Sequence, residues 1–167
     1  MRKILLLTAL AFSLSLGTQA QDWGVGIRLG TPTAFTVKHY FGNNAWDLSL
    51  GTGPYSYGYR NPKGRYRNTG FSAMFNYLWR RDIKNAKGLE WYYGLGGLVT
   101  TRGYYDDDDD DRYTNRISLG ATGAIGLEWF IPAAPISLFA ELNPYVEIVP
   151  APFYIGIMGA LGARFTF

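Results

Sequence analysis

The feature that most constrains the fold is a regular alternation of apolar residues with small or polar ones, which recurs in eight segments from Asp22 onward. Alternation at every second residue places the apolar side chains on one face of a β-strand. Clusters of Gly, Asn, Pro or charged residues separate the segments and are typical of turns. We therefore predict an all-β chain, an eight-stranded antiparallel up-and-down barrel, whose even strand number lets it begin and end on one side. The apolar positions, segment by segment, are Trp23, Val25, Ile27, Leu29; Phe35, Val37, Phe41; Trp46, Leu48, Leu50; Phe71, Ala73, Phe75, Tyr77, Trp79; Leu89, Trp91, Tyr93, Leu95, Val99; Ile117, Leu119, Ala121, Ile125, Leu127, Trp129; Leu138, Ala140, Leu142, Val146, Ile148; and Ile155, Ile157, Leu161, Phe165, Phe167.

Residues 1–20 have the three parts of a secretory signal peptide. Arg2 and Lys3 precede the apolar run Ile4–Leu16, and the small-residue site ends at Ala20. An uncleaved anchor is disfavoured, because the run is shorter than the ~20 residues a transmembrane helix needs. We predict cleavage after Ala20, which makes residues 21–167 a single barrel domain.

Composition excludes several classes of protein. The chain contains no Cys, which removes disulfides, thiolate metal sites and lipoprotein attachment. The formal net charge of +3 falls on processing, because the signal peptide carries two of the 16 basic residues against 13 acidic ones in all. A nearly neutral domain gives no argument for nucleic-acid binding.

The tryptophans indicate which face of the barrel is outside. Three of them open strands that run one way and two close strands that run the other way, so all five lie at one end on the apolar face: Trp23, Trp46, Trp91, Trp79 and Trp129. An eight-stranded lumen barely holds ordinary side chains, so five indoles do not fit inside. Outside, they form a belt at a lipid–water interface. This favours a transmembrane barrel over a soluble, lipocalin-like one with its apolar face inward.

The connections between the segments fit the same assignment of the two ends of the barrel. The short connections Gly42–Asn44 and Ile131–Pro135, and the charged Arg80–Gly88, are predicted at the periplasmic end with the tryptophans. The long connections Pro54–Asn68 and Arg102–Asn115 are predicted outside. Many tyrosines accompany the outer connections: Tyr55, Tyr57, Tyr59, Tyr66, Tyr104, Tyr105, Tyr113 and Tyr154.

The chain resembles the small eight-stranded outer-membrane barrels of OmpA/OmpX-like architecture, and most of all the uncharacterised outer-membrane β-barrel proteins of Bacteroidetes. The resembling stretches are residues 26–32, 43–45, 88–94 and 126–132, together with a last strand that ends on Phe167. The resemblance implies a monomeric protein in the outer membrane of a Gram-negative bacterium, inserted by the barrel-assembly machinery through Phe167. Its partners would be outer-membrane lipid and lipopolysaccharide. It carries no established activity, catalytic residue or cofactor.

Charged residues on the small, inward face form the first candidate site. They are Arg28, Lys38, Glu90, Glu128, Glu141 and Arg164, with Asp47 nearby. A charge buried in a narrow lumen has to be paired or hydrated. We predict an Arg164–Glu128/Glu141 cluster that blocks the lumen; the alternative is an ion or proton pathway.

A run of six aspartates forms the second candidate site: Asp106, Asp107, Asp108, Asp109, Asp110 and Asp111. One interpretation is a solvated loop tip. The other is a calcium site, since Ca²⁺ takes oxygen ligands, although the run lacks the spaced ligands and Gly of a dedicated calcium loop. The preceding outer loop is basic, which suggests contact with the acidic run or with lipopolysaccharide phosphates; its residues are Arg60, Lys63, Arg65 and Arg67.

Catalytic patterns are absent from the sequence. The single histidine, His39, has Val37 and Phe41 as neighbours on the lipid face, and no Ser or Asp is placed to orient it. We expect a structural, surface-interaction protein without enzymatic activity. The alternatives are a lipid-modifying enzyme, either an acyl hydrolase or a transferase, and a narrow pore.

Overall fold

The computed structural model describes residues 22–52, 60–61, 64–106, 113–149 and 152–167. The predicted signal peptide, Asp107–Asp111 and most of the outer tyrosines lie outside the described residues or have side chains that are not described. No helix within the described ranges is long and apolar enough to cross a membrane.

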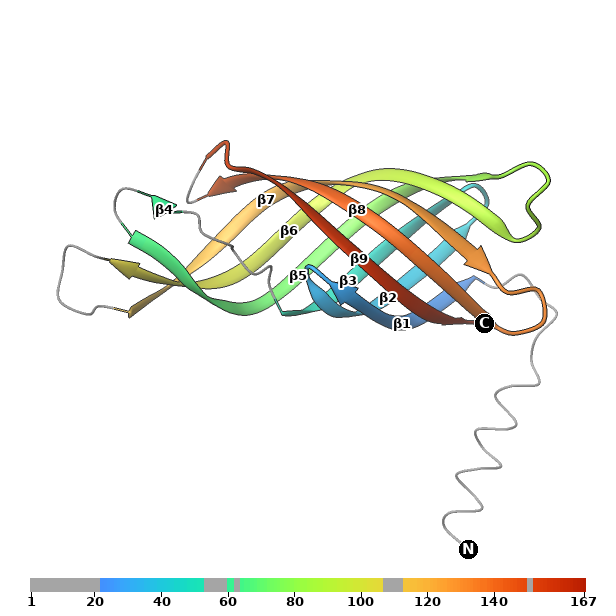
Figure 1. Cartoon of the computed structure of the whole chain (residues 1–167), viewed down its shortest axis with the longest axis horizontal. Coiled ribbons are helices and arrows are strands. Elements are labelled where there is room, and N and C mark those ends of the chain that lie inside the picture. The colour runs from blue at the N-terminus through green and yellow to red at the C-terminus, as the bar shows by residue number, and fades with distance from the viewer. Residues whose placement is uncertain (1–21, 53–59, 62–63, 107–112, 150–151) are drawn as a thin grey trace, which may run out of the picture.

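Eight antiparallel strands close into a barrel, and a ninth two-residue strand lies in a connection (Figure 1). The barrel order is β3-β2-β1-β9-β8-β7-β6-β5, and pairing of β3 with β5 completes the ring, whereas β4 pairs only with β5. The strands are β1 Trp23–Gly30, β2 Thr33–Phe41, β3 Asn44–Thr52, β4 Arg60–Asn61, β5 Gly64–Asp82, β6 Leu89–Asp106, β7 Tyr113–Phe130, β8 Ile136–Val149 and β9 Ile155–Thr166.

The two ends of the described chain close the barrel against each other. Strands β1 and β9 pair from Gly24 opposite Thr166 to Gly30 opposite Ala160. Beyond them, the Trp23 amide donates to the Phe167 carbonyl (3.0 Å) and the Phe167 amide donates to the Trp23 carbonyl (2.9 Å). Closure leaves no unpaired strand edge in the barrel wall, because every barrel strand has two neighbours.

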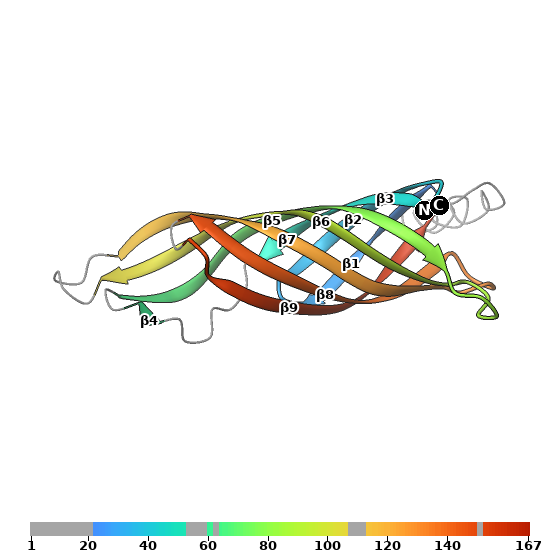
Figure 2. The same ribbon diagram turned by 90° about the horizontal axis from the view of Figure 1, so that it is seen from above.

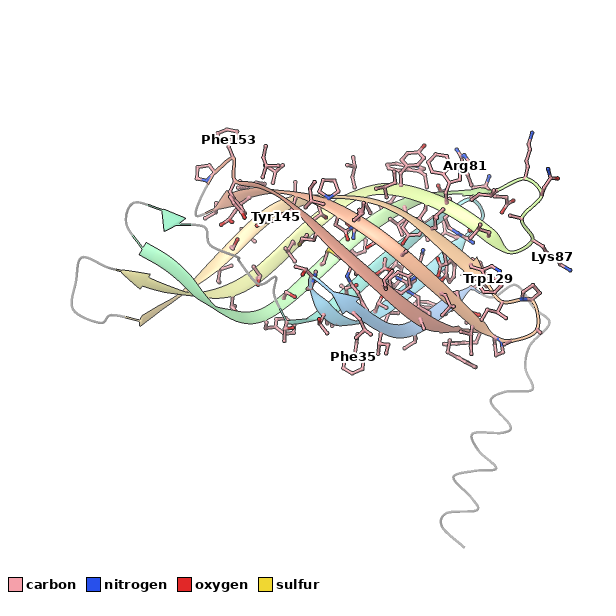
Figure 3. The ribbon with its side chains drawn as sticks, in the orientation of Figure 1. Phe35, Arg81, Lys87, Trp129, Tyr145 and Phe153 are labelled. Atoms are coloured by element: carbon pink, nitrogen blue, oxygen red, sulfur yellow. The ribbon has the colours of Figure 1, made fainter. Side chains whose placement is uncertain are left out.

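The wall is apolar outside and polar inside, which is the reverse of a soluble barrel. Phe35 and Ile157 are 73% and 77% exposed, and Figure 3 shows Phe35 and Trp129 projecting from the wall. Arg28 and Arg164 point inward and are each 1% exposed. The alternation in the sequence therefore assigned inside and outside correctly.

Three strands are longer than predicted. Strands β5, β6 and β7 have 19, 18 and 18 residues, whereas a strand that crosses a bilayer needs ~9–11. The excess forms a three-stranded ribbon that projects beyond β1–β3 (Figure 2). The predicted loops Pro54–Asn68 and Arg102–Asn115 are thus partly strand, as is Arg80–Asp82 of the predicted Arg80–Gly88 connection. Alternating Tyr, Thr and Arg suit a strand and continue the ladder outward.

We call the two ends of the barrel the ribbon end and the turn end. The turn end carries both described termini and the short connections after β2, β5 and β7. The lumen between the ends is filled by side chains, and several are large and apolar, contrary to the predicted small or polar inner face. Met74, Leu98, Tyr145 and Met158 pack together, and Tyr40, Leu78 and Tyr92 belong to a second cluster nearer the turn end.

Candidate functional site

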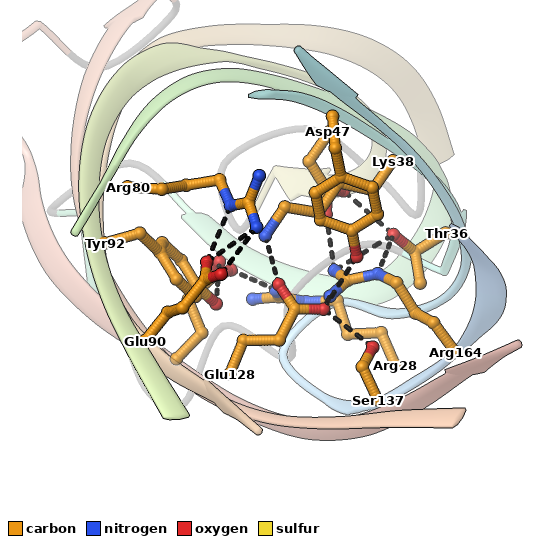
Figure 4. A network of polar contacts seen from close by, with 12 residues as sticks. Arg28, Thr36, Lys38, Asp47, Arg80, Glu90, Tyr92, Glu128, Ser137 and Arg164 are labelled. Carbon is orange, nitrogen blue, oxygen red and sulfur yellow. Dashed lines mark hydrogen bonds and ion pairs between the residues drawn. The ribbon is translucent and has the colours of Figure 1, made fainter. Parts of the chain in front are cut away.

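The centre of the lumen holds a buried group of four charges from four strands, which we call the central group: Lys38, Asp47, Glu128 and Arg164 (Figure 4). Glu128 on β7 is its hub. Its carboxylate accepts hydrogen bonds from the Lys38 ammonium (2.6 Å) and the Arg164 guanidinium (3.1 Å). Tyr40 and Ser137 also donate to it, at 2.8 and 2.7 Å. The lumen thus supplies Glu128 with four donors in place of water.

Arg164 on β9 extends across the lumen to the opposite wall. Its guanidinium pairs with Asp47 on β3 and lies 3.3 Å from the Thr36 hydroxyl, which itself donates to Asp47 (2.8 Å). The Phe139 ring covers the guanidinium at 3.7 Å from the ring centroid. The cation is therefore held by two carboxylates, a hydroxyl and an aromatic face, and water has no access to it.

Arg28 and Glu141 form a second group nearer the ribbon end. Arg28 pairs with Glu141 and donates to the Asn143 side-chain oxygen (2.5 Å), and the Tyr92 hydroxyl donates to Glu141 (2.8 Å). The prediction that Glu141 joins the Arg164 cluster is wrong, since Glu141 bonds to Arg28 and Tyr92. Phe139 is the inward residue before Glu141 on β8, and its ring lies against the Arg164 guanidinium.

Arg80 and Glu90 form a third group at the mouth of the turn end. Two guanidinium nitrogens of Arg80 donate to the two Glu90 oxygens, each at 2.8 Å. The guanidinium also lies over the Tyr40 and Phe130 rings, at 4.6 and 5.6 Å. The side chains are 13% and 16% exposed, so this pair lies between the sealed centre and the solvent.

Sequence reasoning missed Arg80 and the uncharged partners of the three groups. Arg80 was assigned to a charged turn, although its position one residue after outward Trp79 already placed it on the inner face. The uncharged partners are Thr36, Tyr40, Tyr92, Ser137 and Asn143, and all occupy alternate, inward positions. Alternation identifies such residues as inward, but it does not select those that bond to the charges.

Charge is balanced within each group. The central group contains two cations and two anions, and each of the other groups contains one of each. Burying an ion pair is favourable only when the geometry is good and further hydrogen bonds satisfy the remaining polar atoms. The hydroxyl partners meet this requirement in the central group, whereas in the second group the Arg28 Nε is buried without a hydrogen-bond partner. The arrangement is therefore suited to a closed, rigid lumen rather than to a row of mobile charges.

The five tryptophans lie on the outer face near the turn end. Aromatic contacts connect most of them: Trp23 with Trp46 at 5.4 Å, Trp79 with Tyr93 at 5.5 Å, and Trp91 with Tyr93 at 5.4 Å between ring centroids. Trp129 lies one strand further, on β7 beside β6. The result is a band of amphipathic rings at one level of the wall, which is the arrangement favoured at a lipid–water interface.

His39 lies within this band, on the outer face of the wall. Its ring lies 4.4 Å from the Trp23 ring and 5.6 Å from the Trp46 ring, and Nδ1 is 2.9 Å from the Asp22 carbonyl oxygen. In the described part of the chain, no three His, Asp or Glu side chains gather in a way that would hold a metal ion. Calcium binding by Asp106–Asp111 stays a prediction, because the described side chains do not include that run.

Comparison with known proteins gives one informative likeness. No protein-family model matches the chain, and no curated protein matches it. Its fold is similar to the crystal structure of Neisserial surface protein A (NspA), an outer-membrane β-barrel, with a TM-score of 0.50 and 10% sequence identity over 87% of this chain and 93% of that chain. Identity this low supports a shared fold and nothing finer. The predicted fold class is therefore confirmed: the chain is an eight-stranded antiparallel β-barrel of the outer-membrane type.

Proposed function

We propose that this protein resides in the outer membrane of a Gram-negative bacterium, with the turn end in the periplasm and the ribbon at the cell surface. The apolar wall, the aromatic band at the turn end and the likeness to NspA support this placement. In that environment the protein acts as a structural, surface-interaction barrel and not as an enzyme or a pore.

The sealed lumen is the observation that carries this proposal. Glu128 on β7 and Arg164 on β9 are each 1% exposed and bind each other in the lumen, and Arg164 also reaches Asp47 on β3 across it. An ion entering this region would have to break pairs whose separated charges cost several kcal/mol each to leave unpaired. The position of His39 outside the barrel, among aromatic rings, argues against a serine–histidine mechanism in the lumen.

The ribbon supports the surface-interaction part of the proposal. It extends three paired strands beyond the length needed to cross a bilayer, so its backbone ladder continues away from the lipid. The register places Gly64, which lies within the basic segment beside Arg65, opposite Asp106, where the acidic run begins. The start of the acidic run and part of the basic segment thus lie on the adjacent strands β6 and β5.

Planar-bilayer recordings test the sealed lumen. The refolded protein is expected to show no sustained conductance, because the central group blocks the lumen. A variant with Arg80→Ser and Glu90→Ser serves as the matched control: it removes only the pair at the mouth and is expected to remain closed. Steady, ion-selective openings of the unmodified protein would establish a pore and reject the structural role.

The absence of cysteine allows a direct test of orientation. A single cysteine is introduced at Pro152, exposed in the ribbon-end connection between β8 and β9, or at Lys84, exposed in the turn after β5. A membrane-impermeant maleimide is expected to label Pro152→Cys in intact cells, and to label Lys84→Cys only after the outer membrane is permeabilised. The reverse pattern would invert the proposed orientation, and labelling of neither variant in broken cells would contradict the described exposure.

A further inference from the structure

We propose that the outer wall of this barrel binds one glycerophospholipid of the periplasmic leaflet, with an acyl chain in an apolar groove across β6–β9 and β1 and its phosphate on Arg81. The inference rests on the membrane placement proposed above. It adds a specific lipid site to a wall that would otherwise contact lipid uniformly.

The groove is a depression of about 620 Å³ on the outward face of the wall. Its floor is formed where two small outward residues, Ala140 on β8 and Gly159 on β9, stand among larger ones. Leu127, Leu142 and Leu161 form its sides. A smooth wall of leucines would offer lipid only a flat surface, whereas this groove can enclose one hydrocarbon chain along its length.

The strand register gives the groove a direction and two ends. Successive paired residues form one row across six strands, from the turn end to the ribbon-end half of β1: Arg81, Trp91, Leu127, Ala140, Leu161 and Leu29. Trp91 and Leu29 are four strand spacings apart, or about 19 Å at 4.7–4.9 Å per spacing. The row runs perpendicular to the strands, and the strands are tilted by ~35–45° from the membrane normal. The row therefore rises by about 12 Å along that normal. That is close to one half of a hydrocarbon core ~30 Å thick, which is the depth of one leaflet.

A cation lies at the low end of the row. Arg81 faces outward on β5, is exposed, and is the register partner of Trp91, which belongs to the aromatic band. Its Nη1 donates to the Arg80 carbonyl (2.9 Å), and within the described part of the chain it has no ion pair. A guanidinium offers five N–H donors in a planar fork that fits phosphate. Arg81 therefore lies at headgroup depth, where the lipid phosphate is found.

Charge complementarity selects a phospholipid over a second copy of the barrel. The groove is apolar along its membrane-embedded length, and only its interfacial end is cationic, so its ligand has to combine a long hydrocarbon chain with an anion at one end. A neighbouring barrel presents a wall of apolar side chains at the depth of the groove. A glycerophospholipid has both parts at the required separation.

The floor can be filled without disturbing the lumen. A Cβ atom on Gly159 would meet Leu142 Cδ2 at 3.4 Å and the Glu141 carbonyl at 3.9 Å, which is ordinary contact, so Gly159→Leu would place its side chain in the groove. Gly97 on β6 is the matched control, because it also faces outward, does not line the groove, and has only the Gly120 carbonyl near, at 3.6 Å. For the headgroup, Arg81→Gln is compared with Lys87→Gln, which alters an exposed cation on the turn (Figure 3).

The experiment measures lipid retention by native mass spectrometry. Each variant is refolded in detergent micelles, checked for the compact, heat-modifiable form on gels, and titrated with palmitoyl-oleoyl phosphatidylethanolamine. We expect one lipid per barrel in the unmodified protein, and retention lower by roughly tenfold in Gly159→Leu and by roughly threefold to tenfold in Arg81→Gln, since tenfold corresponds to ~1.4 kcal/mol. Gly97→Leu and Lys87→Gln are expected to retain lipid as the unmodified protein does. Diacylglycerol with the same chains, which lacks the phosphate, should bind more weakly and be insensitive to Arg81→Gln.

The outcomes distinguish this proposal from the membrane placement. A folded barrel that inserts into vesicles but retains lipid equally in Gly159→Leu and Gly97→Leu would reject the groove. A dimer that is lost in Gly159→Leu, with no bound lipid, would assign the groove to a second copy. Failure of the unmodified barrel to insert would reject the membrane placement itself. If Gly159→Leu does not fold, Ala140→Leu fills the same floor from β8 and supports the same comparison.

Discussion

Replacing Glu128 with leucine is expected to lower the free energy of unfolding of the barrel by ~3–5 kcal/mol, the cost of removing one partner from a buried ion pair. Glu128 accepts hydrogen bonds from Lys38 and Arg164. Without it, two buried cations share the single carboxylate of Asp47, which already pairs with Arg164. Lys38 then loses its ion-pair partner while it stays fully buried, at 0% exposure.

Urea unfolding in lipid vesicles, followed by tryptophan fluorescence, measures this change. A shift of the midpoint at constant slope reports stability alone. Glu90→Gln is the matched control: Glu90 also pairs with an arginine, but at the partly exposed mouth, so its loss is expected to cost at most ~1 kcal/mol. A Glu128→Leu variant as stable as Glu90→Gln would contradict the description of the central group.

A double variant separates the charge imbalance from the loss of packing. Lys38→Met combined with Glu128→Leu removes one cation and one anion and leaves the Arg164–Asp47 pair intact. Buried ion pairs replaced by apolar residues of similar size are often neutral for stability. The double variant is therefore expected to be more stable than Glu128→Leu alone. If the two single changes simply add, Lys38 and Glu128 are not coupled in the way their 2.6 Å contact implies.

Much of the fold followed from the sequence, because alternation reports directly on which face a strand residue occupies. The positions of Trp23 and Trp129 were predicted from chain order alone, and so were the inward positions of Arg28 and Glu128. Strand ends were harder to predict, since Tyr, Thr and Arg in the outer segments are as compatible with a strand as with a loop. Pairing with a neighbouring strand decided that they continue the ladder.

The partners of the inward charges could not be predicted in the same way. Alternation gives the face of Glu141 but not the direction in which the side chains of Arg28 and Arg164 extend. Both arginines face the same lumen from neighbouring strands, and long side chains reach across several strand spacings. In the structure Arg28 extends to Glu141, whereas Arg164 lies against the Phe139 ring and extends to Glu128 and Asp47. Which charges pair in a filled lumen thus depends on the directions of long side chains, which alternation does not report.

Replacing Gly26 with alanine is expected to open the seam between β1 and β9 at a cost of ~3 kcal/mol or more, because overpacking costs ~1–3 kcal/mol even where neighbours can adjust. A Cβ atom on Gly26 would lie 1.9 Å from the Ala163 carbonyl oxygen and 2.7 Å from the Arg164 Cα. Both are backbone atoms of the pairing strand, so no side-chain movement relieves the contact. Separation of the strands would also displace Arg164, the residue opposite Gly26, from Asp47 and Glu128.

Gly97→Ala is the same chemical change at another position, and we expect it to have the opposite effect on the stability of the barrel. Gly97 faces outward on β6, and the nearest atom to an added Cβ is the Gly120 carbonyl oxygen at 3.6 Å. Removing the conformational freedom of a glycine from a strand is expected to leave stability unchanged or to raise it by up to ~1 kcal/mol. The two variants are compared by their urea midpoints in vesicles and by the fraction that migrates as a compact barrel on unheated gels. Equal behaviour would mean that β1 and β9 do not approach as closely as described, whereas loss of the compact form only in Gly26→Ala shows that closure of the barrel depends on the close approach of these two strands.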